Sequence, residues 1–258
     1  MASLASATSP GSVLLAFAVF MATGVPTLQA QTRPTLPPTN QQMFAPLELP
    51  DPTGVRSPTG EPGNDYWQQT SDYEIRVRLD PDAHRVSGSE VISYTNNSPD
   101  ELEFLWIQLE QNLFSPDSRG DFVNSGSRWR GSFPGGGLEL TKVEVVQDGG
   151  RYTPGTSIDD TRIRVDLASP LPPSSGEVQI ELEWSFLVPE YGADRMGRFN
   201  GEDGWVYELA QWYPRMYVYD DLDGWNPLPY LGQGEFYLDY GDFDVEITVP
   251  RDFIVVAG

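Results

Sequence analysis

The feature that most constrains the fold of this chain is a period of two in its apolar residues. From Tyr73 to Leu79 every second residue is apolar and the residues between are charged, and positions 178–186 repeat the alternation. Such a pattern is typical of a β-strand with one buried and one solvated face. Further strands are expected at 86–95, 102–109, 138–146, 163–167 and 243–249, with a long edge loop at 120–137. No segment shows a sustained helical stripe, so the sequence predicts an all-β fold, an antiparallel β-sandwich.

The composition excludes several classes of function. The chain has 258 residues, with 38 Asp and Glu against 16 Lys and Arg, and a net charge of -22. Nucleic-acid binding needs clustered basic residues that release counterions, so no nucleic-acid partner is expected. With no Cys and one His, the chain cannot by itself form a disulfide framework, a thiolate nucleophile or a Cys/His zinc site. We therefore expect no metal ligand, catalytic residue or cofactor in this chain alone.

The beginning of the chain has the features of a signal peptide. Positions 13–25 form an uncharged apolar run, which is followed by Pro26 and by the small residue Ala30. This is the order of a hydrophobic region and a cleavage site, so residues 1–30 are predicted to be a signal peptide. A membrane anchor is disfavoured, because spanning a bilayer takes ~20 apolar residues and this run is shorter. The protein is expected to be periplasmic or secreted, without a membrane span.

The next segment, residues 31–64, is rich in Pro, Thr and Gly and has no periodic apolar face. Such a composition favours extended, solvated chain, so a linker or disordered leader is predicted here. The folded β domain is therefore expected at residues 65–258. Its hydrophobic content is consistent with a packed core, since 39% of the whole chain is hydrophobic.

Aromatic and acidic residues crowd together between positions 205 and 240. A calcium site is one interpretation, because residues 221–224 (Asp-Leu-Asp-Gly) look like part of an EF-hand loop. However, Tyr219 stands where the loop should open and Tyr230 where the bidentate acid should be. A solvated turn rich in Asp and Gly is the better interpretation.

A carbohydrate site is a second interpretation of the same stretch. Asp220 and Asp223 could act on a glycosidic bond if their carboxyl groups lay ~5 to 9.5 Å apart. Aromatic side chains in an all-β domain are nevertheless more often part of a core or an interface than of a lectin platform. The residues that could stack on sugar rings are Trp205, Trp212, Tyr213, Trp225 and Tyr230.

Two blocks of the sequence carry a recognisable motif. The first, at 82–114, contains S-G-x-x-x-I-x-Y-x-N-N-S and ends near N-x-F; the matching residues are Ser87, Gly88, Ile92, Tyr94, Asn96, Asn97, Ser98, Asn112 and Phe114. The second starts with A-Q-W-Y-P-R at 210–215 and continues through P-Y-L-G and G-E-F-Y to Val249 and Pro250. In this order the blocks resemble the amino-terminal domain of aminopeptidase-N-like zinc metallopeptidases, in their bacterial branch. The resemblance covers roughly residues 66–258.

The resemblance implies a saddle-like β domain that precedes a separate catalytic domain. In the family, that second domain carries H-E-x-x-H, a distant Glu as third zinc ligand and a G-x-M-E-N motif, none of which occurs here. His84 is expected to be a solvated surface residue at a strand entry. Because residues 254–258 stop without a terminating loop or helix, the chain is expected to be the front part of a longer enzyme and inactive alone. Its expected partners are the zinc-binding catalytic domain of the same polypeptide and a peptide substrate.

The resemblance also suggests a substrate-binding residue. In the family, the amino-terminal domain lends a Gln to the free ammonium group of the substrate, and Gln211 stands at the matching place. Tyr213 and Glu208 are further candidates in the same stretch, whereas Arg215 is expected to pair with nearby acids. Gln211 could instead satisfy backbone groups between strands. A secreted carbohydrate- or protein-binding β module without catalysis also stays open as an alternative function.

Overall fold

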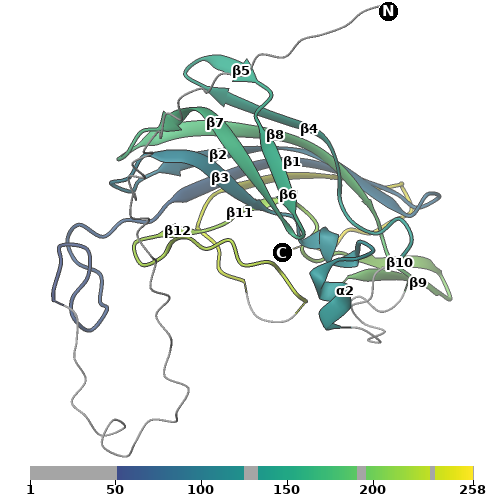
Figure 1. Cartoon of the computed structure of the whole chain (residues 1–258). Coiled ribbons are helices and arrows are strands. Elements are labelled where there is room, and N and C mark those ends of the chain that lie inside the picture. Colours follow the sequence, from purple (N-terminus) through teal and green to yellow (C-terminus); the bar gives the residue numbers. More distant parts are fainter. Residues whose placement is uncertain (1–50, 125–132, 191–195, 233–235, 258) are drawn as a thin grey trace, which may run out of the picture. The chain divides into compact units, whose positions relative to one another are not determined.

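The computed structural model describes residues 51–124, 133–190, 196–232 and 236–257 (Figure 1). The chain divides into two compact units, Met1–Glu48 and Leu49–Gly258, and the described residues belong to the second. The predicted signal peptide at 1–30 and the first part of the predicted linker lie outside the described residues. They therefore stay predictions.

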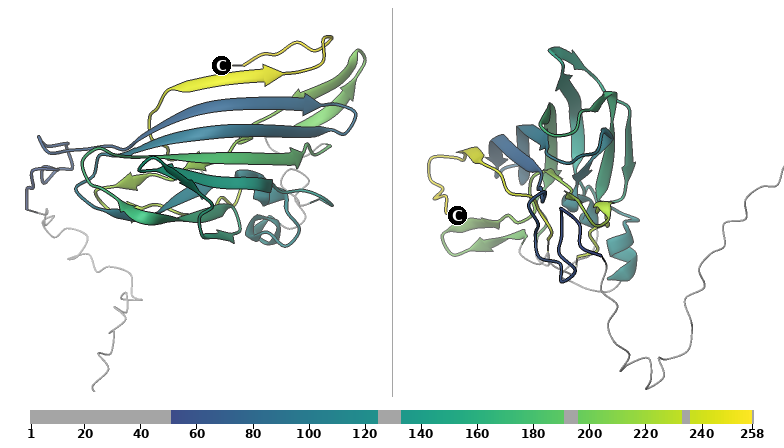
Figure 2. Two further views of the ribbon diagram at one scale, coloured as in Figure 1. Left: turned by 90° about the horizontal axis from the view of Figure 1, so that it is seen from above. Right: turned by 90° about the vertical axis from the view of Figure 1, so that its left-hand side faces the viewer.

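The larger sheet of the second unit is mixed. Its strands, in spatial order, are β14 (Phe243–Thr248), β1 (Thr70–Asp80), β2 (Arg85–Asn96), β8 (Gly176–Leu187), β4 (Glu139–Gln147) and β5 (Gly150–Tyr152). From β1 to β5 all neighbours are antiparallel, and Glu90 of β2 lies between Ile75 of β1 and Leu182 of β8. β14 runs parallel to β1, with Tyr73 beside Phe243. Figure 2 shows β14, in yellow, at the edge of this sheet.

The second sheet is antiparallel and is followed through Figure 1 by its labels. Its order is β11 (Arg215–Met216), β3 (Leu102–Gln108), β7 (Arg162–Leu171) and β6 (Thr156–Asp159). Two short helices follow β3, the 3-10 helix η1 (Glu110–Phe114) and α2 (Arg119–Val123). Among the described residues, no helix is both long enough and apolar enough to traverse a lipid bilayer.

The helix α2 corrects one expectation, because it occupies the start of the 120–137 range predicted as a loop. The Ser118 side chain accepts a hydrogen bond from the Asp121 N–H at 3.0 Å, which caps this turn. A helix of five residues is too short to show a periodic apolar stripe, so the sequence pattern could not reveal it. Residues 125–132 of the same range lie outside the described part of the chain.

One hydrophobic core lies between the two sheets. The alternation in β1 and β8 places the apolar residues of each strand inward, as predicted. The opposite sheet contributes apolar residues of β3 and β7, such as Leu105 and Val165, both of which are fully buried. Because two sheets bury one face each against the other, the prediction of an all-β sandwich is confirmed.

The strand predicted at 243–249 exists, but its environment differs from the expectation. The pattern predicted a half-buried strand, whereas all six residues of β14 are exposed; Phe243, Val245 and Ile247 are 52%, 39% and 38% exposed. Alternation shows which residues share a face. It does not show whether another layer covers that face, or whether the strand pairs in parallel.

Two hairpins and a structured segment complete the described fold. The hairpins are β9 (Gly197–Gly201) with β10 (Gly204–Glu208), and β12 (Tyr219–Asp220) with β13 (Gly224–Trp225). The segment is the last part of the predicted linker, where Arg56 pairs with Pro62 in an isolated bridge and with Asp221 through an ion pair. The ion pair connects this described part of the predicted linker to the β12–β13 hairpin, and the linker at 31–64 stays a prediction.

Candidate functional site

The stretch 208–216 carries the candidate binding residues and connects the β9–β10 hairpin to the smaller sheet. It leaves β10 at Glu208 and enters β11 at Arg215. β11 is paired with β3, with Arg215 opposite Gln108. The Gln108 side chain also donates a hydrogen bond to the Met216 carbonyl oxygen at 3.0 Å. The far end of the stretch is therefore fixed to the core, and its middle lies between this anchor and the hairpin.

Gln211 adopts an uncommon backbone conformation in the middle of the stretch. Its φ is 48°, in the left-handed region that costs a residue other than glycine on the order of 1 kcal/mol. Gln111 of η1, which is 2% exposed, donates hydrogen bonds from Nε2 to the carbonyl oxygens of Ala210 at 3.2 Å and of Gln211 at 2.8 Å. Strained backbone persists where its surroundings fix it, and these two bonds supply such a constraint.

The three predicted binding residues have different environments. Gln211 and Tyr213 are half-buried, whereas Glu208 is exposed at the end of β10. The Tyr213 ring packs edge-on against Tyr73, with 5.8 Å between ring centroids, and against Phe243. Burial raises the pKa of the Tyr213 hydroxyl, and nearby Arg215 offsets part of this effect. These contacts give Tyr213 a packing role, while Gln211 combines partial exposure with a fixed backbone.

A buried ion pair lies directly after Gln211 and Tyr213. Arg215 Nε donates to Glu110 Oε1 at 3.0 Å, and Nη2 contacts the same oxygen. The two side chains are 10% and 1% exposed. Burial raises the pKa of the Glu110 carboxyl, and the adjacent guanidinium offsets part of that increase. Arg215 thus forms the expected ion pair, but with an acid of η1 instead of the acids near it in the sequence.

A second buried acid, Glu90, lies on the inward face of β2. It is 2% exposed, and both of its carboxyl oxygens lack a hydrogen-bond partner in the described part of the chain. Burial of this carboxyl group raises its pKa well above the usual value. The Trp184 indole on the neighbouring strand explains Gly88, where a Cβ would lie 2.5 Å from the Trp184 ring. Burial therefore favours the protonated form of Glu90.

The aromatic residues of the 205–240 stretch mostly pack against one another or the core. Trp212 lies 5.9 Å from Trp184, measured between ring centroids, and Trp225 lies 6.1 Å from Tyr94. Trp184 and Tyr94 are both fully buried. The contacts favour the interpretation of these aromatics as core residues over a platform for sugar rings.

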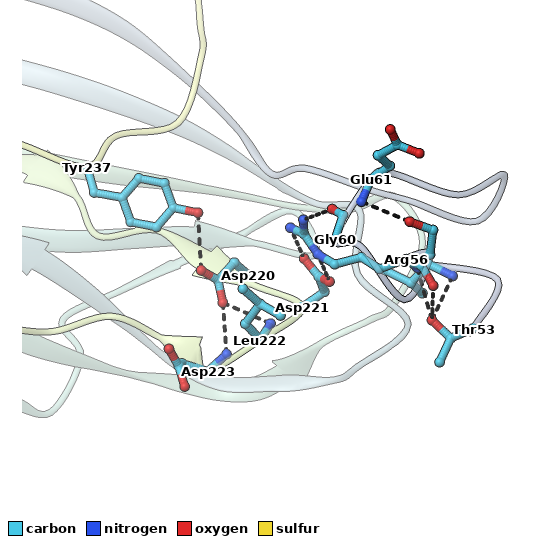
Figure 3. A network of polar contacts seen from close by, with 11 residues as sticks. Thr53, Arg56, Gly60, Glu61, Asp220, Asp221, Leu222, Asp223 and Tyr237 are labelled. Atoms are coloured by element: carbon cyan, nitrogen blue, oxygen red, sulfur yellow. Dashed lines mark hydrogen bonds and ion pairs between the residues drawn. The ribbon is translucent and has the colours of Figure 1, made fainter. Parts of the chain in front are cut away.

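The acidic turn between β12 and β13 is held by protein groups (Figure 3). Asp221 accepts two hydrogen bonds from Arg56, from Nε at 2.5 Å and from Nη2 at 2.8 Å. These bonds hold the pKa of Asp221 below its usual range. Among the described residues no group of three or more His, Cys, Asp or Glu side chains could hold a metal ion. The arrangement favours a structural turn over an EF-hand-like loop.

Asp220, one of the two acids considered for glycosidic chemistry, has a structural role in the same turn (Figure 3). Its Oδ1 accepts the backbone N–H groups of Leu222 at 3.0 Å and Asp223 at 2.9 Å, and its Oδ2 accepts the Tyr237 hydroxyl at 3.1 Å. This is an Asx turn, in which a side chain replaces a backbone acceptor. Asp220 is therefore occupied in shaping the hairpin.

A cavity of about 710 Å³ lies between the 51–60 segment and this hairpin. Trp67 and Tyr219 form an aromatic wall, with ring centroids 5.9 Å apart. Asp100 accepts a hydrogen bond from the Tyr219 hydroxyl at 2.9 Å, and Arg56 is held by Asp221. These polar lining groups bind one another, which favours a structural role for this region.

His84 corrects a prediction, because it is half-buried and not a solvated surface residue. Its Nδ1 lies 2.7 Å from the Tyr207 hydroxyl, and its ring lies edge-on to Trp205 with 4.5 Å between centroids. Burial lowers the pKa of the imidazole, and Arg198 lowers it further. His84 thus joins the β1–β2 turn to the β9–β10 hairpin that leads to Gln211.

Sequence reasoning missed three buried polar residues, namely Glu90, Glu110 and Gln111, of which the last two bind the 208–216 stretch. Glu90 could have been found, because it occupies an inward position of the β2 alternation where an apolar residue is expected. Glu110 and Gln111 follow directly after β3 and carry no such signal. Their role follows from contacts with residues about a hundred positions later, which no local pattern contains.

Comparisons with known proteins were made by sequence and by structure. No protein-family model matches the sequence, and none of the curated proteins matches it. Among solved structures, the chain is similar to the M1 zinc metallopeptidase from Deinococcus radiodurans, with 16% sequence identity over 71% of this chain and 33% of that chain, at a TM-score of 0.37.

A mutant of that M1 zinc metallopeptidase bound to a Tyr-Ser-Ala substrate is similar over 74% of this chain and 34% of that chain, with 14% identity and a TM-score of 0.36. A mutant described as a two-domain M1 zinc metallopeptidase bound to L-arginine is 14% identical over 71% of this chain and 33% of that chain, with a TM-score of 0.37. The chain therefore spans about a third of the length of the structures it matches.

Proposed function

We propose that this chain is the amino-terminal, substrate-cleft domain of an exported zinc metallopeptidase of the aminopeptidase type. In this role it binds the free amino terminus of a peptide, while a catalytic domain of the same polypeptide holds the metal. The proposal starts from the two sequence blocks that resemble such domains. The observation that carries it further is the geometry of Gln211 within the second block.

Gln211 has the features required of a binding residue on a loop. It is half-buried, and its backbone is held in the left-handed region by Gln111. Loops that carry function are commonly presented by a rigid scaffold, and strain at such loops is typical of functional sites. The alternative, in which the Gln211 side chain only satisfies backbone groups, gives no reason for a strained backbone at this position.

The chemistry of a primary amide suits an ammonium ligand. The amide oxygen accepts a hydrogen bond from the ammonium group without adding a negative charge to an already acidic protein. Hydrogen bonds to a charged group contribute about 1.5–3 kcal/mol, more than bonds between neutral groups. Holding the amino end of the peptide fixes the distance to its first peptide bond. Cleavage is then limited to the first peptide bond, so the enzyme would remove one residue at a time because of how the peptide is positioned.

Zinc would be held outside this chain. The 258 residues contain no H-E-x-x-H motif. A catalytic zinc ion polarises a carbonyl group and lowers the pKa of bound water. The part assigned to this chain is separate from that chemistry, because it consists of binding and orienting the substrate's amino terminus.

The first test is substitution of Gln211 by Ala in the longer zinc-binding protein. We expect kcat/KM for a peptide with a free amino terminus to fall by about 10- to 100-fold, which corresponds to the loss of one charge-assisted hydrogen bond. The same peptide with an acetylated amino terminus should lose less than about twofold. Rates for both substrates are measured under identical conditions.

The matched control is Gln179→Ala, which removes an exposed glutamine from the outer face of β8. This variant should leave the ratio of kcat/KM for the free-amine substrate to kcat/KM for the acetylated substrate unchanged. Equal losses on both substrates for Gln211→Ala would contradict the anchoring role. A reading frame without H-E-x-x-H and a downstream Glu would instead support the binding module that lacks catalysis.

A further inference from the structure

The helix η1 contacts the 208–216 stretch through two consecutive side chains. Glu110 binds Arg215, and Gln111 binds the carbonyl oxygens of Ala210 and Gln211. Each of the two residues is only 2% exposed, so water does not compete for these bonds. The stretch is therefore held from η1 at its middle and at its far end.

The two bonds from Gln111 constrain the stretch where its backbone departs from ordinary geometry. A carboxamide nitrogen has two N–H groups, and here both are directed at successive backbone carbonyl oxygens, at 3.2 Å and 2.8 Å. Two bonds to neighbouring peptide groups fix the orientation of both peptide planes. The second of these peptide groups belongs to Gln211, whose φ of 48° is uncommon for a residue other than glycine.

Backbone orientation decides where the Gln211 side chain lies. The Cα–Cβ direction is set by φ and ψ, so a change from the left-handed region to an extended conformation would redirect the whole side chain. A displacement of about 1 Å in a group that positions a substrate is enough to cost a large part of its effect. Holding the backbone is therefore a prerequisite for any binding role of this amide.

We infer that Gln111 is a positioning residue, which holds Ala210 and Gln211 in the left-handed turn that presents the Gln211 amide to the amino terminus of a peptide. This inference rests on the proposed function of Gln211. Gln111 itself does not touch the substrate, because its amide is engaged with the two backbone carbonyl groups.

The structural test uses this chain and the variant Gln111→Met, which keeps the length of the side chain and removes its two donors. We expect the backbone carbon chemical shifts of Gln211 to move from left-handed to extended values. The amide order parameters of residues 210–212 should fall from about 0.85 to below about 0.6, as for a flexible loop. Gln111→Leu serves as a second variant in case the first does not fold, and circular dichroism checks both.

The matched control is Gln147→Met. Gln147 is also a buried glutamine that donates to a backbone carbonyl oxygen, but it binds Ser169, outside the 208–216 stretch. This control should leave the shifts and order parameters of residues 210–212 unchanged. If Gln111→Met and Gln111→Leu both fold with unchanged shifts and order parameters at these residues, the inference is overturned.

The functional test uses the longer zinc-binding protein. Gln111→Met should lower kcat/KM for a free-amine peptide by roughly tenfold and should leave kcat/KM for the acetylated peptide within about twofold of wild type. The control Gln147→Met should not change the ratio of the two kcat/KM values. The positioning role is overturned if Gln211→Ala lowers the ratio of kcat/KM for the free-amine peptide to kcat/KM for the acetylated peptide while Gln111→Met leaves this ratio unchanged. An unchanged ratio in Gln211→Ala overturns the proposed anchor instead, and the order parameters still decide what Gln111 does to the backbone.

Discussion

At the scale of single residues, two buried glutamates of the described chain, Glu90 and Glu110, have carboxyl oxygens without a hydrogen-bond partner. Glu110 shares one carboxyl oxygen with Arg215, and its Oε2 has no hydrogen-bond partner among the described residues. Glu90 has none for either oxygen in that part of the chain. Burying a carboxylate without a partner is costly, so burial favours the protonated form of Glu90.

The raised pKa of Glu90 makes a prediction for the pH dependence of stability. In the unfolded chain this carboxyl loses its proton near pH 4.5, whereas the folded protein retains it to higher pH. The stabilising contribution of protonated Glu90 is therefore fully present below the pKa that this carboxyl has in the unfolded chain. It is lost as the pH rises toward the pKa in the folded protein, and the free energy of unfolding falls by about 1.4 kcal/mol per pH unit over that range. Glu90→Gln removes this titration. It should increase the free energy of unfolding relative to wild type more at pH 8 than at pH 5.

Urea unfolding of both proteins between pH 5 and pH 9 measures this difference. Glu74→Gln is the control, because it removes an exposed carboxylate from the neighbouring strand β1. It should give nearly the same change at every pH. A constant difference between wild type and Glu90→Gln across the range would show that Glu90 ionises freely in the folded protein.

At the scale of elements, β14 is the least protected strand of the larger sheet. It is an edge strand, it pairs only with β1, and its apolar residues Phe243, Val245 and Ile247 are exposed in the described structure. An exposed apolar edge strand presents free backbone groups to other chains and favours self-association.

For this chain studied alone, we predict that Val245→Lys weakens self-association. A charge on the apolar face of β14 opposes edge-to-edge pairing, and a tenfold increase in the dissociation constant corresponds to about 1.4 kcal/mol. Sedimentation velocity over a range of concentrations measures the effect. Glu246→Gln is the control, because it changes the net charge by the same amount on the opposite face of β14. It should change the dissociation constant of self-association less than Val245→Lys does. If both variants weaken self-association equally, the cause is the change in net charge and not the disruption of pairing at the β14 edge.

At the scale of the whole molecule, acidic charge dominates. The net charge of -22 opposes compaction, because like charges repel one another. Exposed ion pairs such as Arg76 with Glu246 work in the opposite direction, but each contributes little in water. The balance therefore favours repulsion, which salt screens.

We expect the melting temperature to rise by a few degrees between ~0.05 M and ~0.5 M sodium chloride, since the Debye length falls to a few ångströms over this range. Scanning calorimetry of the chain at neutral pH measures the change. Sorbitol, which does not screen charge, serves as the control for general solute effects. A lower melting temperature in salt would mean that ion pairs outweigh repulsion.

The alternation of apolar and polar residues determined much of this fold from the sequence alone. It located the long strands and the residues of β1 and β8 that face the core, because side chains of a strand alternate between its two faces. The resemblance carried by the A-Q-W-Y-P-R motif, and not the alternation, pointed to Gln211. These are local properties, since each depends on residues within about ten positions of one another.

Only the tertiary structure decided the strand order, the parallel β1–β14 pair and the contacts that build the site. Gln111 meets Gln211 across 100 positions, Glu110 meets Arg215 across 105, and Arg56 meets Asp221 across 165. Such contacts form when the packing of two sheets brings distant segments together. The physical reason is that a periodic pattern fixes which face of a strand is buried, but it carries no information about which distant residue lies opposite.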